Sequence, residues 1–260
     1  MLGTLHELYD YRSMVYNLVK RDLRGRYKGS LLGFLWNFIL PIMQIIVYIL
    51  VFTIIFKQDI EDYYVYLIVG MVPWFMFSDS LNYGSGSVVD NSQLITKIYF
   101  PRSVIPVSVV ISKFINFLIS MVFVFIMLIV VGHGVEPMAL ITLPLAILCL
   151  FLFSMGMTMV LASLNVYMRD VQYMVTVILM MLIWMTPIMY VRGFVDNEFF
   201  NLILSINPLT YLVELFQSAL YWGALPPIET VLIASLESLA MAFIGAYVYS
   251  RLSVDFAEVL

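Results

Sequence analysis

The sequence predicts an all-α membrane protein with about six transmembrane helices, an N-terminal amphipathic interfacial helix and a re-entrant helix pair between spans 5 and 6. Apolar residues make up 63% of the chain and charged residues only 12%, with a mean hydropathy of +0.99. A soluble domain of this size carries about a quarter charged residues. Because long uncharged runs also recur along the chain, we expect hydrocarbon to surround most of it.

Uncharged runs, together with two runs that contain an acidic residue, define the predicted spans. The uncharged runs are Gly29–Phe56, Phe114–Val135, Pro137–Met168 and Val171–Val191. Each reaches the roughly 20 apolar residues that a helix needs to cross a bilayer. The second span contains Asp79 and the sixth contains Glu237. We predict one transmembrane domain over 31–260, with spans at about 31–56, 63–83, 106–132, 138–164, 172–191 and 230–250.

Basic residues gather on one side of this predicted topology. With six spans, both termini share a side with the loops near 84–103 and 165–171. The basic residues on that side are Arg12, Lys20, Arg21, Arg24, Arg26, Lys28, Lys97, Arg102, Arg169 and Arg251. The opposite side holds Lys57 and Arg192 among several acidic residues. Because cytoplasmic loops carry an excess of Lys and Arg, we expect both termini in the cytoplasm.

The stretch from Phe199 to Leu225 does not fit a simple span. It is apolar, but Asn207-Pro208 breaks it and Glu214 interrupts its second half. A seventh span would place Arg251 outside the cell, so we interpret the stretch as two half-helices that dip into the membrane and return. Non-helical backbone at that depth must be buried in protein or line a wet cavity. An external loop with amphipathic surface helices stays open as the alternative.

The segment over 1–30 predicts a cytoplasmic amphipathic helix. One helical face carries Leu8, Tyr11, Val15 and Leu18, and another carries Lys20, Arg24 and Lys28. Such a helix lies in the membrane interface, where anionic headgroups attract its basic residues. A sharper hypothesis is that Arg24, Arg26 and Lys28 bind the phosphates of a lipid-linked substrate, because guanidinium groups suit phosphate oxygens.

Small residues recur at a spacing of four in two spans. One stripe consists of Ser154, Thr158 and Ala162, and the other of Ser238, Ala242, Ala246 and Ser250. Small side chains let helix backbones approach closely in a membrane. The stripes therefore predict close helix packing, either within the chain or between two copies.

A set of different short motifs, each present once, is spread over the whole chain. The motifs are Arg21-Asp22-Leu23, Arg26-Tyr27-Lys28, Ser30, Leu32-Gly33, Trp36, Pro41, Tyr99-Phe100-Pro101-Arg102, Asn165-Val166 with Arg169-Asp170-Val171, and Asn207-Pro208-Leu209. Together they resemble the type-2 ABC permeases that export polysaccharide. They are more similar to O-antigen, capsule and teichoic acid exporters than to drug or haem exporters.

The resemblance implies a transport subunit of lipopolysaccharide or teichoic acid biosynthesis in the cell inner (cytoplasmic) membrane. It implies a homodimer that works with two separate ABC ATPase subunits, and a polysaccharide linked to an undecaprenyl phosphate or pyrophosphate carrier. Membrane lipids are also expected partners, and nucleic acid is not. A type-2 ABC exporter of another amphiphile, such as a drug or a glycolipid, stays open as the alternative.

The resemblance also implies that two cytoplasmic loops dock the ATPase. The candidate docking residues are Leu94, Lys97, Ile98, Tyr99, Phe100 and Arg102 in the first loop, and Arg169 and Asp170 in the second. Apolar side chains of the first loop would fill a groove on the ATPase, with its basic residues at the rim. From the residues alone, the first loop predicts an interfacial helix that lies on lipid, and Arg169-Asp170 a local ion pair.

Aromatic residues crowd the predicted external side. Most are expected to anchor the chain at the interface, and a subset to stack against sugar rings in a glycan conduit. The conduit candidates are Tyr190, Phe199, Tyr211, Trp222 and Glu237. Glu237 lies well inside the last span, where ionisable groups usually face a partner or a cavity. A structural role, with a hydrogen bond to Ser235 or to a neighbouring helix, stays open for it.

Catalytic chemistry is not expected of this chain. No G-x-x-x-x-G-K-[ST] run is present, and Gly84-Ser85-Gly86-Ser87 lacks the lysine of a phosphate loop. ATP and Mg²⁺ would therefore be bound by the partner ATPase, and no cofactor or metal by this chain. Asp79, Asp90 and Ser85 do not form an intramembrane protease site, because Asp90 lies in a loop and no histidine within the membrane activates a serine.

Overall fold

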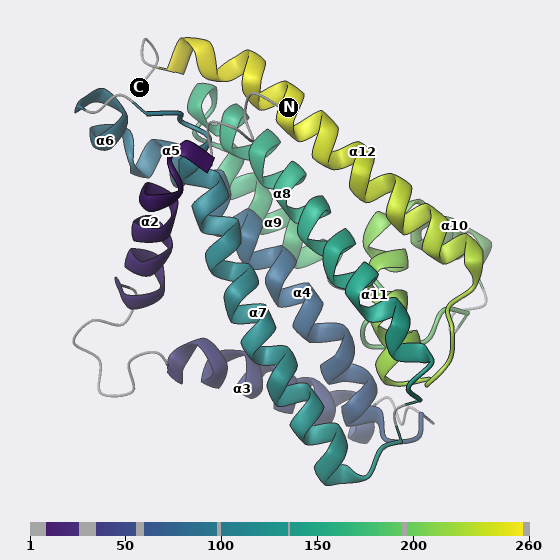
Figure 1. The fold of residues 1–260 in the computed structure, drawn as a ribbon. Coiled ribbons are helices and arrows are strands. Elements are labelled where there is room, and N and C mark those ends of the chain that lie inside the picture. Colours follow the sequence, from purple (N-terminus) through teal and green to yellow (C-terminus); the bar gives the residue numbers. More distant parts are fainter. Residues whose placement is uncertain are drawn as a thin grey trace.

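The computed structural model describes residues 9–25, 35–55, 60–97, 100–134, 136–193 and 197–256, and within these ranges the chain is helical, with no strand. Figure 1 shows the arrangement. The helices are α2 Arg12–Gly25, α3 Trp36–Leu50, the π-helix η2 Val51–Ile55, α4 Tyr63–Ser85, α5 Ser87–Asp90, α6 Ser92–Lys97, α7 Val104–Val131, the 3₁₀ helix η3 Ala139–Thr142, α8 Leu143–Tyr167, α9 Val171–Leu182, α10 Glu198–Ile206, α11 Pro208–Leu220, α12 Ile228–Leu252 and the 3₁₀ turn η4 Ser253–Asp255.

Long apolar helices dominate the fold, as expected of an integral membrane protein. Within the described ranges, four helices are long and apolar enough to cross a bilayer: α4, α7, α8 together with η3, and α12 with η4. A fifth candidate is the broken pair formed by α10 and α11. The prediction of an all-α membrane protein is confirmed at this level. The count of six spans and the boundaries of the transmembrane domain stay predictions.

One predicted span contains a shorter helix than the sequence suggested. In the fifth span α9 has 12 residues, whereas α3 and η2 in the first span continue from Trp36 to Ile55 within the described residues. Twelve residues of α-helix measure about 18 Å, short of the roughly 30 Å hydrocarbon core. Helix α9 ends early because Pro187 follows it, and a residue before proline avoids helical dihedrals. Residues 183–193 continue as irregular turns.

Helix α4 is the centre of the described bundle. It packs against α3, α7, α8, α9 and α11, and Val65, Leu67 and Met71 on it are inaccessible to solvent. At Gly84 an added Cβ would lie 2.2 Å from Thr158 Cγ2 on α8, so a larger residue there would force the Thr158 side chain to move. Because α4 is buried on several faces, its apolar residues are spread around the helix and do not form one stripe.

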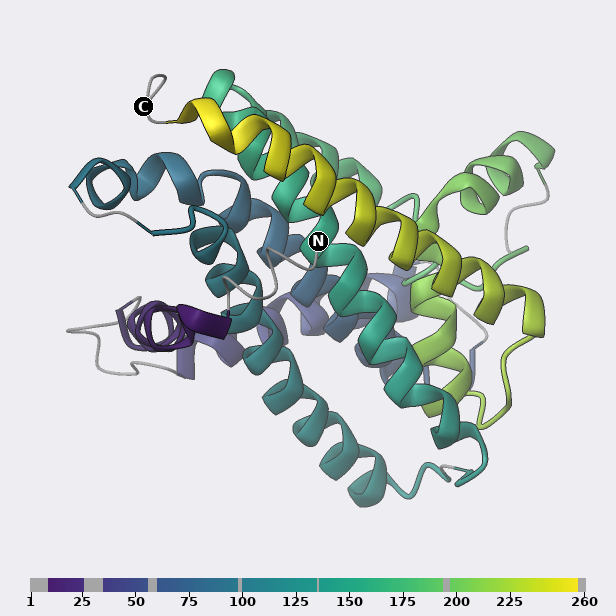
Figure 2. The ribbon, with the colours of Figure 1, turned by 45° about the horizontal axis from the view of Figure 1, so that its top comes forward.

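Helices α8 and α12 pack backbone against backbone (Figure 2). A Cβ on Gly156 would lie 2.2 Å from the Met241 carbonyl oxygen, and one on Gly245 would lie 2.3 Å from the Gly156 carbonyl oxygen. The predicted close packing within the chain is therefore present, but these two glycines were not in the predicted stripes. The stripe of Ser154, Thr158 and Ala162 is fully buried, whereas Ser250 of the other stripe is exposed.

Replacing Gly156 by Ala is expected to destabilise the protein by about 1–3 kcal/mol, because the new methyl group meets backbone that cannot rotate away. Thermal unfolding of the protein purified in detergent measures the effect. Gly134→Ala is the matched control, because nothing lies within 4 Å of a Cβ built at Gly134. Equal melting temperatures for the two variants would contradict the close contact.

Candidate functional site

A break between α10 and α11 organises the first part of the candidate site. The two helices are bent by 84° at Asn207. The Asn207 Oδ1 accepts a hydrogen bond from the Leu209 N–H at 3.1 Å, which caps α11, and Pro208 occupies its first turn. The Asn207 Nδ2 donates to the Met185 carbonyl at 2.8 Å and to Thr186 Oγ1 at 2.9 Å. The predicted break at Asn207-Pro208 is present, while a re-entrant path through the membrane stays a prediction.

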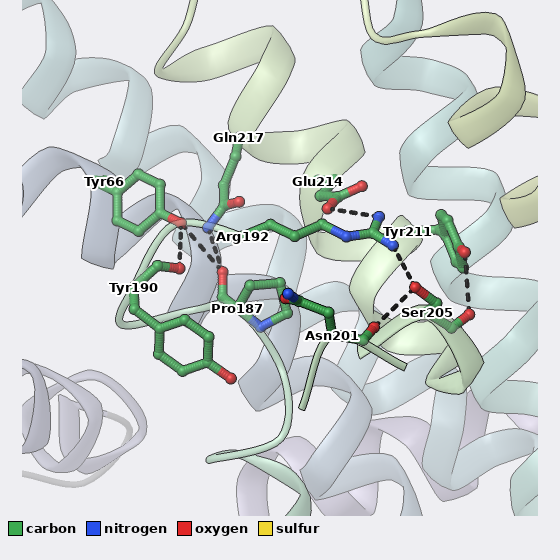
Figure 3. A network of polar contacts seen from close by, with 9 residues as sticks. All are labelled: Tyr66, Pro187, Tyr190, Arg192, Asn201, Ser205, Tyr211, Glu214 and Gln217. Atoms are coloured by element: carbon green, nitrogen blue, oxygen red, sulfur yellow. Dashed lines mark hydrogen bonds and ion pairs between the residues drawn. The ribbon is translucent and has the colours of Figure 1, made fainter. Parts of the chain in front are cut away.

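The irregular segment after α9 is held by buried side chains of α4 and α11 (Figure 3). Tyr66 donates its hydroxyl to the Tyr190 carbonyl at 2.8 Å and the Pro187 carbonyl at 3.2 Å. The Gln217 Nε2 donates to the same Pro187 carbonyl at 2.9 Å. Tyr66 is 1% and Gln217 is 3% exposed. These bonds satisfy carbonyl groups that no helix pairs, as non-helical backbone away from water requires.

Arg192 joins the two half-helices on the other side of this network (Figure 3). Its Nη2 donates to Ser205 Oγ at 2.6 Å, and its Nη1 lies 3.5 Å from Glu214 Oε1. The guanidinium carbon also lies 5.6 Å from the centre of the Tyr211 ring. Tyr211 in turn donates its hydroxyl to the Ser205 carbonyl at 3.0 Å. Arg192 therefore bridges α10 and α11 and supports their angle, although both charged side chains are partly exposed.

The predicted conduit residues separate into two groups in this structure. Tyr190 and Tyr211 are each 9% exposed and serve the polar network, whereas Phe199 is 71% and Trp222 is 53% exposed. Glu237 lies on α12 and takes no part in the contacts of Figure 3 among the described residues. Its Oε2 is buried without a hydrogen-bond partner there. The predicted bond to Ser235 is absent, since the Ser235 hydroxyl donates to the Val231 carbonyl instead.

A second polar cluster ties the ends of three helices beside Trp222. The ring of His133, after α7, stacks on Tyr221, with centroids 5.4 Å apart. The His133 Nδ1 lies 3.4 Å from Asp62 Oδ2 at the start of α4. Burial raises the pKa of the Tyr221 hydroxyl above its ordinary value, and the carboxylates of Asp62 and Glu61 raise it further. Tyr221 therefore stays protonated and donates to the Glu61 carbonyl.

The predicted docking residues differ widely in accessibility. Lys97, Arg169 and Asp170 are exposed. Phe100 is 6% exposed and packs with Leu94 against α2 and α7, which leaves it no surface for a partner in this conformation. The candidates Ile98 and Tyr99 lie outside the described residues, as do the side chain of Arg24 and the phosphate candidates Arg26 and Lys28.

Helix α2 packs on the protein through the face predicted to be apolar. Leu18 lies in a cluster with Phe100, Val104 and Ile105, and Tyr11 and Val15 pack against it. A buried ion pair fixes the same helix, because Lys113 Nζ of α7 lies 3.5 Å from Asp22 Oδ2. The Ser112 hydroxyl donates to the same carboxylate oxygen. Sequence analysis missed this attachment, although an acidic residue between two arginines was its visible signal.

Comparison with known proteins agrees with the fold. Residues 14–221 match the ABC-2 type transporter family. The chain is 32% identical over 259 residues to the O-antigen export system permease protein RfbA of Myxococcus xanthus, covering 99% of each chain. It is 30% identical over 260 residues to the RfbA permease of Klebsiella pneumoniae, covering 100% of this chain and 98% of the relative. It is 24% identical over 238 residues to the polysialic acid transport protein KpsM of Escherichia coli, covering 89% and 90%. Because the family match spans most of the chain and the relatives align from end to end, the chain belongs to the ABC-2 type transporter family.

Proposed function

We propose that this chain is the transmembrane permease subunit of an ATP-driven exporter that moves undecaprenyl-linked polysaccharide of the O-antigen, capsule or teichoic acid type across the cytoplasmic membrane. The alignment with the Myxococcus xanthus O-antigen export permease carries the proposal, because it covers 99% of both chains. The alternative is an exporter of another amphiphile within the same family, such as a drug or a glycolipid.

The arrangement of helix ends supports cytoplasmic docking of ATPase subunits. Helices α5 and α6 lie at one end of the bundle together with the turn between α8 and α9, opposite the last residues of α7 (Figure 1). We propose that this end faces the cytoplasm and that both termini lie on that side. Two ABC ATPase subunits would bind there and supply ATP and Mg²⁺, with Lys97, Arg169 and Asp170 exposed to meet them.

A second copy of the chain is the proposed partner within the membrane. Helix α9 packs on α4 and α8, yet Tyr173, Val177 and Met181 on it are more than half exposed. We propose that a helix from a second copy covers this exposed face and encloses a conduit with it. The short α9 does not cross the bilayer alone, so the second copy would also complete the wall of the conduit. Phe199 and Trp222 would offer exposed rings to the glycan, and Tyr190, Tyr211 and Glu237 would reach it only after a rearrangement.

An apolar groove argues that lipid and glycan take different routes. The groove of about 540 Å³ lies between α3, α4 and α7 and is lined mainly by apolar side chains, including Ile45, Val72 and Phe123. Most sugar hydroxyl groups would lose water there without gaining a protein partner, because the only polar side chains in the described part of the lining are Asp79, Lys113, Asn116 and Ser120. The groove therefore suits hydrocarbon, while the phosphates of the carrier would meet Arg24, Arg26 and Lys28 in the basic segment.

A genetic complementation test addresses the proposed substrate. A strain lacking its own O-antigen permease, supplied with this chain and its ATPase subunit, is expected to regain surface polysaccharide. The same cells should show no gain in drug resistance. Restored drug efflux without surface glycan would favour the alternative and overturn the proposed substrate.

Reversing two exposed docking charges tests the ATPase interface. Lys97→Glu combined with Arg169→Glu is expected to reduce co-purification of the ATPase subunit about tenfold. The two new carboxylates would repel the acidic groups of the ATPase that face the basic side chains in the native complex. Arg251→Glu is the control, since Arg251 is equally exposed near the same end but outside both loops. Unchanged recovery of the ATPase with the double variant would reject these loops as its docking site.

A further inference from the structure

The turn that follows α12 touches both proposed docking segments. In Figures 1 and 2 the last turn of α12 lies beside the end of α8, at the end of the bundle that also holds α5 and α6. The Arg102 Nη1 donates to the Ser253 carbonyl, and also to the Val254 carbonyl at 3.2 Å. The Tyr167 hydroxyl donates to the Leu252 carbonyl at 2.9 Å. Arg102 closes the first docking loop and Tyr167 lies in the second, two residues before Arg169, so one turn of backbone accepts bonds from both.

Phe256 anchors this turn in the protein. Its side chain is 0% exposed and packs in a cluster with Val88 of α5 and with Met159, Ala162 and Val166 of α8. Its ring lies 5.6 Å from that of Tyr249 and 6.1 Å from that of Tyr167. Complete burial of a phenylalanine is among the larger contributions that one side chain makes to stability.

The contacts of Arg102 have a clear electrostatic reason. The last carbonyl groups of a helix have no intrahelical partner and carry a partial negative charge. A guanidinium group offers several N–H donors in a fixed plane, so it can serve two such carbonyls at once. In this structure Arg102 therefore binds carbonyl groups of its own chain, at the end of α12, and its contact with an ATPase stays a prediction.

We propose that Ser253–Phe256 acts as a clasp that fixes the distance between the two docking segments, with Arg102 and Phe256 as positioning residues. The proposal rests on the proposed function only in assigning those segments to the ATPase. Helix α5 also packs on α8, so loss of the clasp loosens the two segments without separating them. An ATPase that must contact both segments would then meet a variable spacing and bind more weakly.

Distance measurements between spin labels at Lys97→Cys and Met168→Cys, in a Cys149→Ala background, test the clasp. Both sites are exposed, and labelled copies are diluted with unlabelled copies so that distances within one chain dominate. Without ATPase, Phe256→Ala and Arg102→Gln are expected to widen the distance distribution about twofold. Val254→Ala, at a side chain that is 72% exposed, should leave it unchanged, and Arg102→Lys should restore part of the order. Arg102→Gln empties no core position, so it keeps the test valid if Phe256→Ala does not fold.

The same variants without labels are then compared for ATPase binding. Phe256→Ala and Arg102→Gln are expected to raise the dissociation constant of the ATPase subunit about tenfold, with Val254→Ala as control. Equal distance distributions in all variants would overturn the clasp, whatever the ATPase does. Wider distributions with unchanged ATPase affinity would overturn its role in docking. Whether these loops dock the ATPase at all is tested separately, by the charge-reversal variant at Lys97 and Arg169.

Discussion

Asp22→Ala is expected to destabilise the protein by about 3–5 kcal/mol, far more than Lys113→Met. The Lys113 side chain is 2% exposed, and its Nζ lies 3.5 Å from Asp22 Oδ2 and 4.4 Å from the centre of the Tyr83 ring. Removing the carboxylate leaves a buried ammonium group without this counterion. Removing the ammonium leaves a carboxylate that is 27% exposed and still accepts the Ser112 hydroxyl, so the cost is smaller.

Thermal unfolding in detergent measures this asymmetry. The melting temperature of Asp22→Ala should fall well below that of Lys113→Met, and the double variant should recover most of the loss. Asp10→Ala is the control, because Asp10 is an exposed carboxylate close to the same helix. Equal losses for the two single variants, or a double variant no better than Asp22→Ala, would contradict a buried ion pair between α2 and α7.

Asn207→Ala is expected to reduce export about tenfold, because this residue joins α10, α11 and the segment after α9 in the candidate site. The change removes the cap of α11, which is typically worth about 1 kcal/mol. It also removes the two bonds to Met185 and Thr186, and a buried acceptor without a partner costs about 1–3 kcal/mol. The angle between α10 and α11 then loses one of its attachments to the segment after α9, while the contacts of Arg192 remain.

Asn197→Ala is the matched control for this prediction. Asn197 also caps a helix, since its side chain accepts the Phe200 N–H at 3.1 Å, but it is exposed. Surface polysaccharide is measured in the complemented strain, together with the amount of permease in the membrane. Export should persist in Asn197→Ala and fall in Asn207→Ala at equal protein levels. Equal export in both would show that the bend takes no part in transport.

Local signals explain how much of the fold the sequence could predict. The uncharged runs locate α7 and α8, and an apolar run that contains Glu237 locates α12, because a helix in hydrocarbon must be apolar over most of its length. Asn207-Pro208 marks the break before α11, since asparagine caps helices and proline favours their first turn. Both features depend on a few neighbouring residues, so no tertiary contact was needed to find them.

The polar contacts that hold the site depend on residues far apart in the sequence. Tyr66 lies 121 positions from Pro187, and Arg102 lies 151 positions from Ser253. Apolar patterning cannot show which carbonyl a buried tyrosine or arginine will meet. For the same reason it named Tyr190 and Tyr211 as conduit candidates without showing that both side chains are buried. A charged or polar residue inside an apolar stretch, such as Gln217, was the available signal.

Transport by purified protein tests the central claim most directly. The permease and its ATPase subunit are reconstituted together in liposomes, and complexes with the ATPase on the outside are activated by external ATP. Undecaprenyl-linked polysaccharide is supplied in the outer leaflet. The account predicts that added ATP and Mg²⁺ carry the glycan into the lumen, where it is protected from an added glycosidase. Glycan that stays accessible to the enzyme, while the reconstituted complex hydrolyses ATP and moves a drug instead, would contradict it.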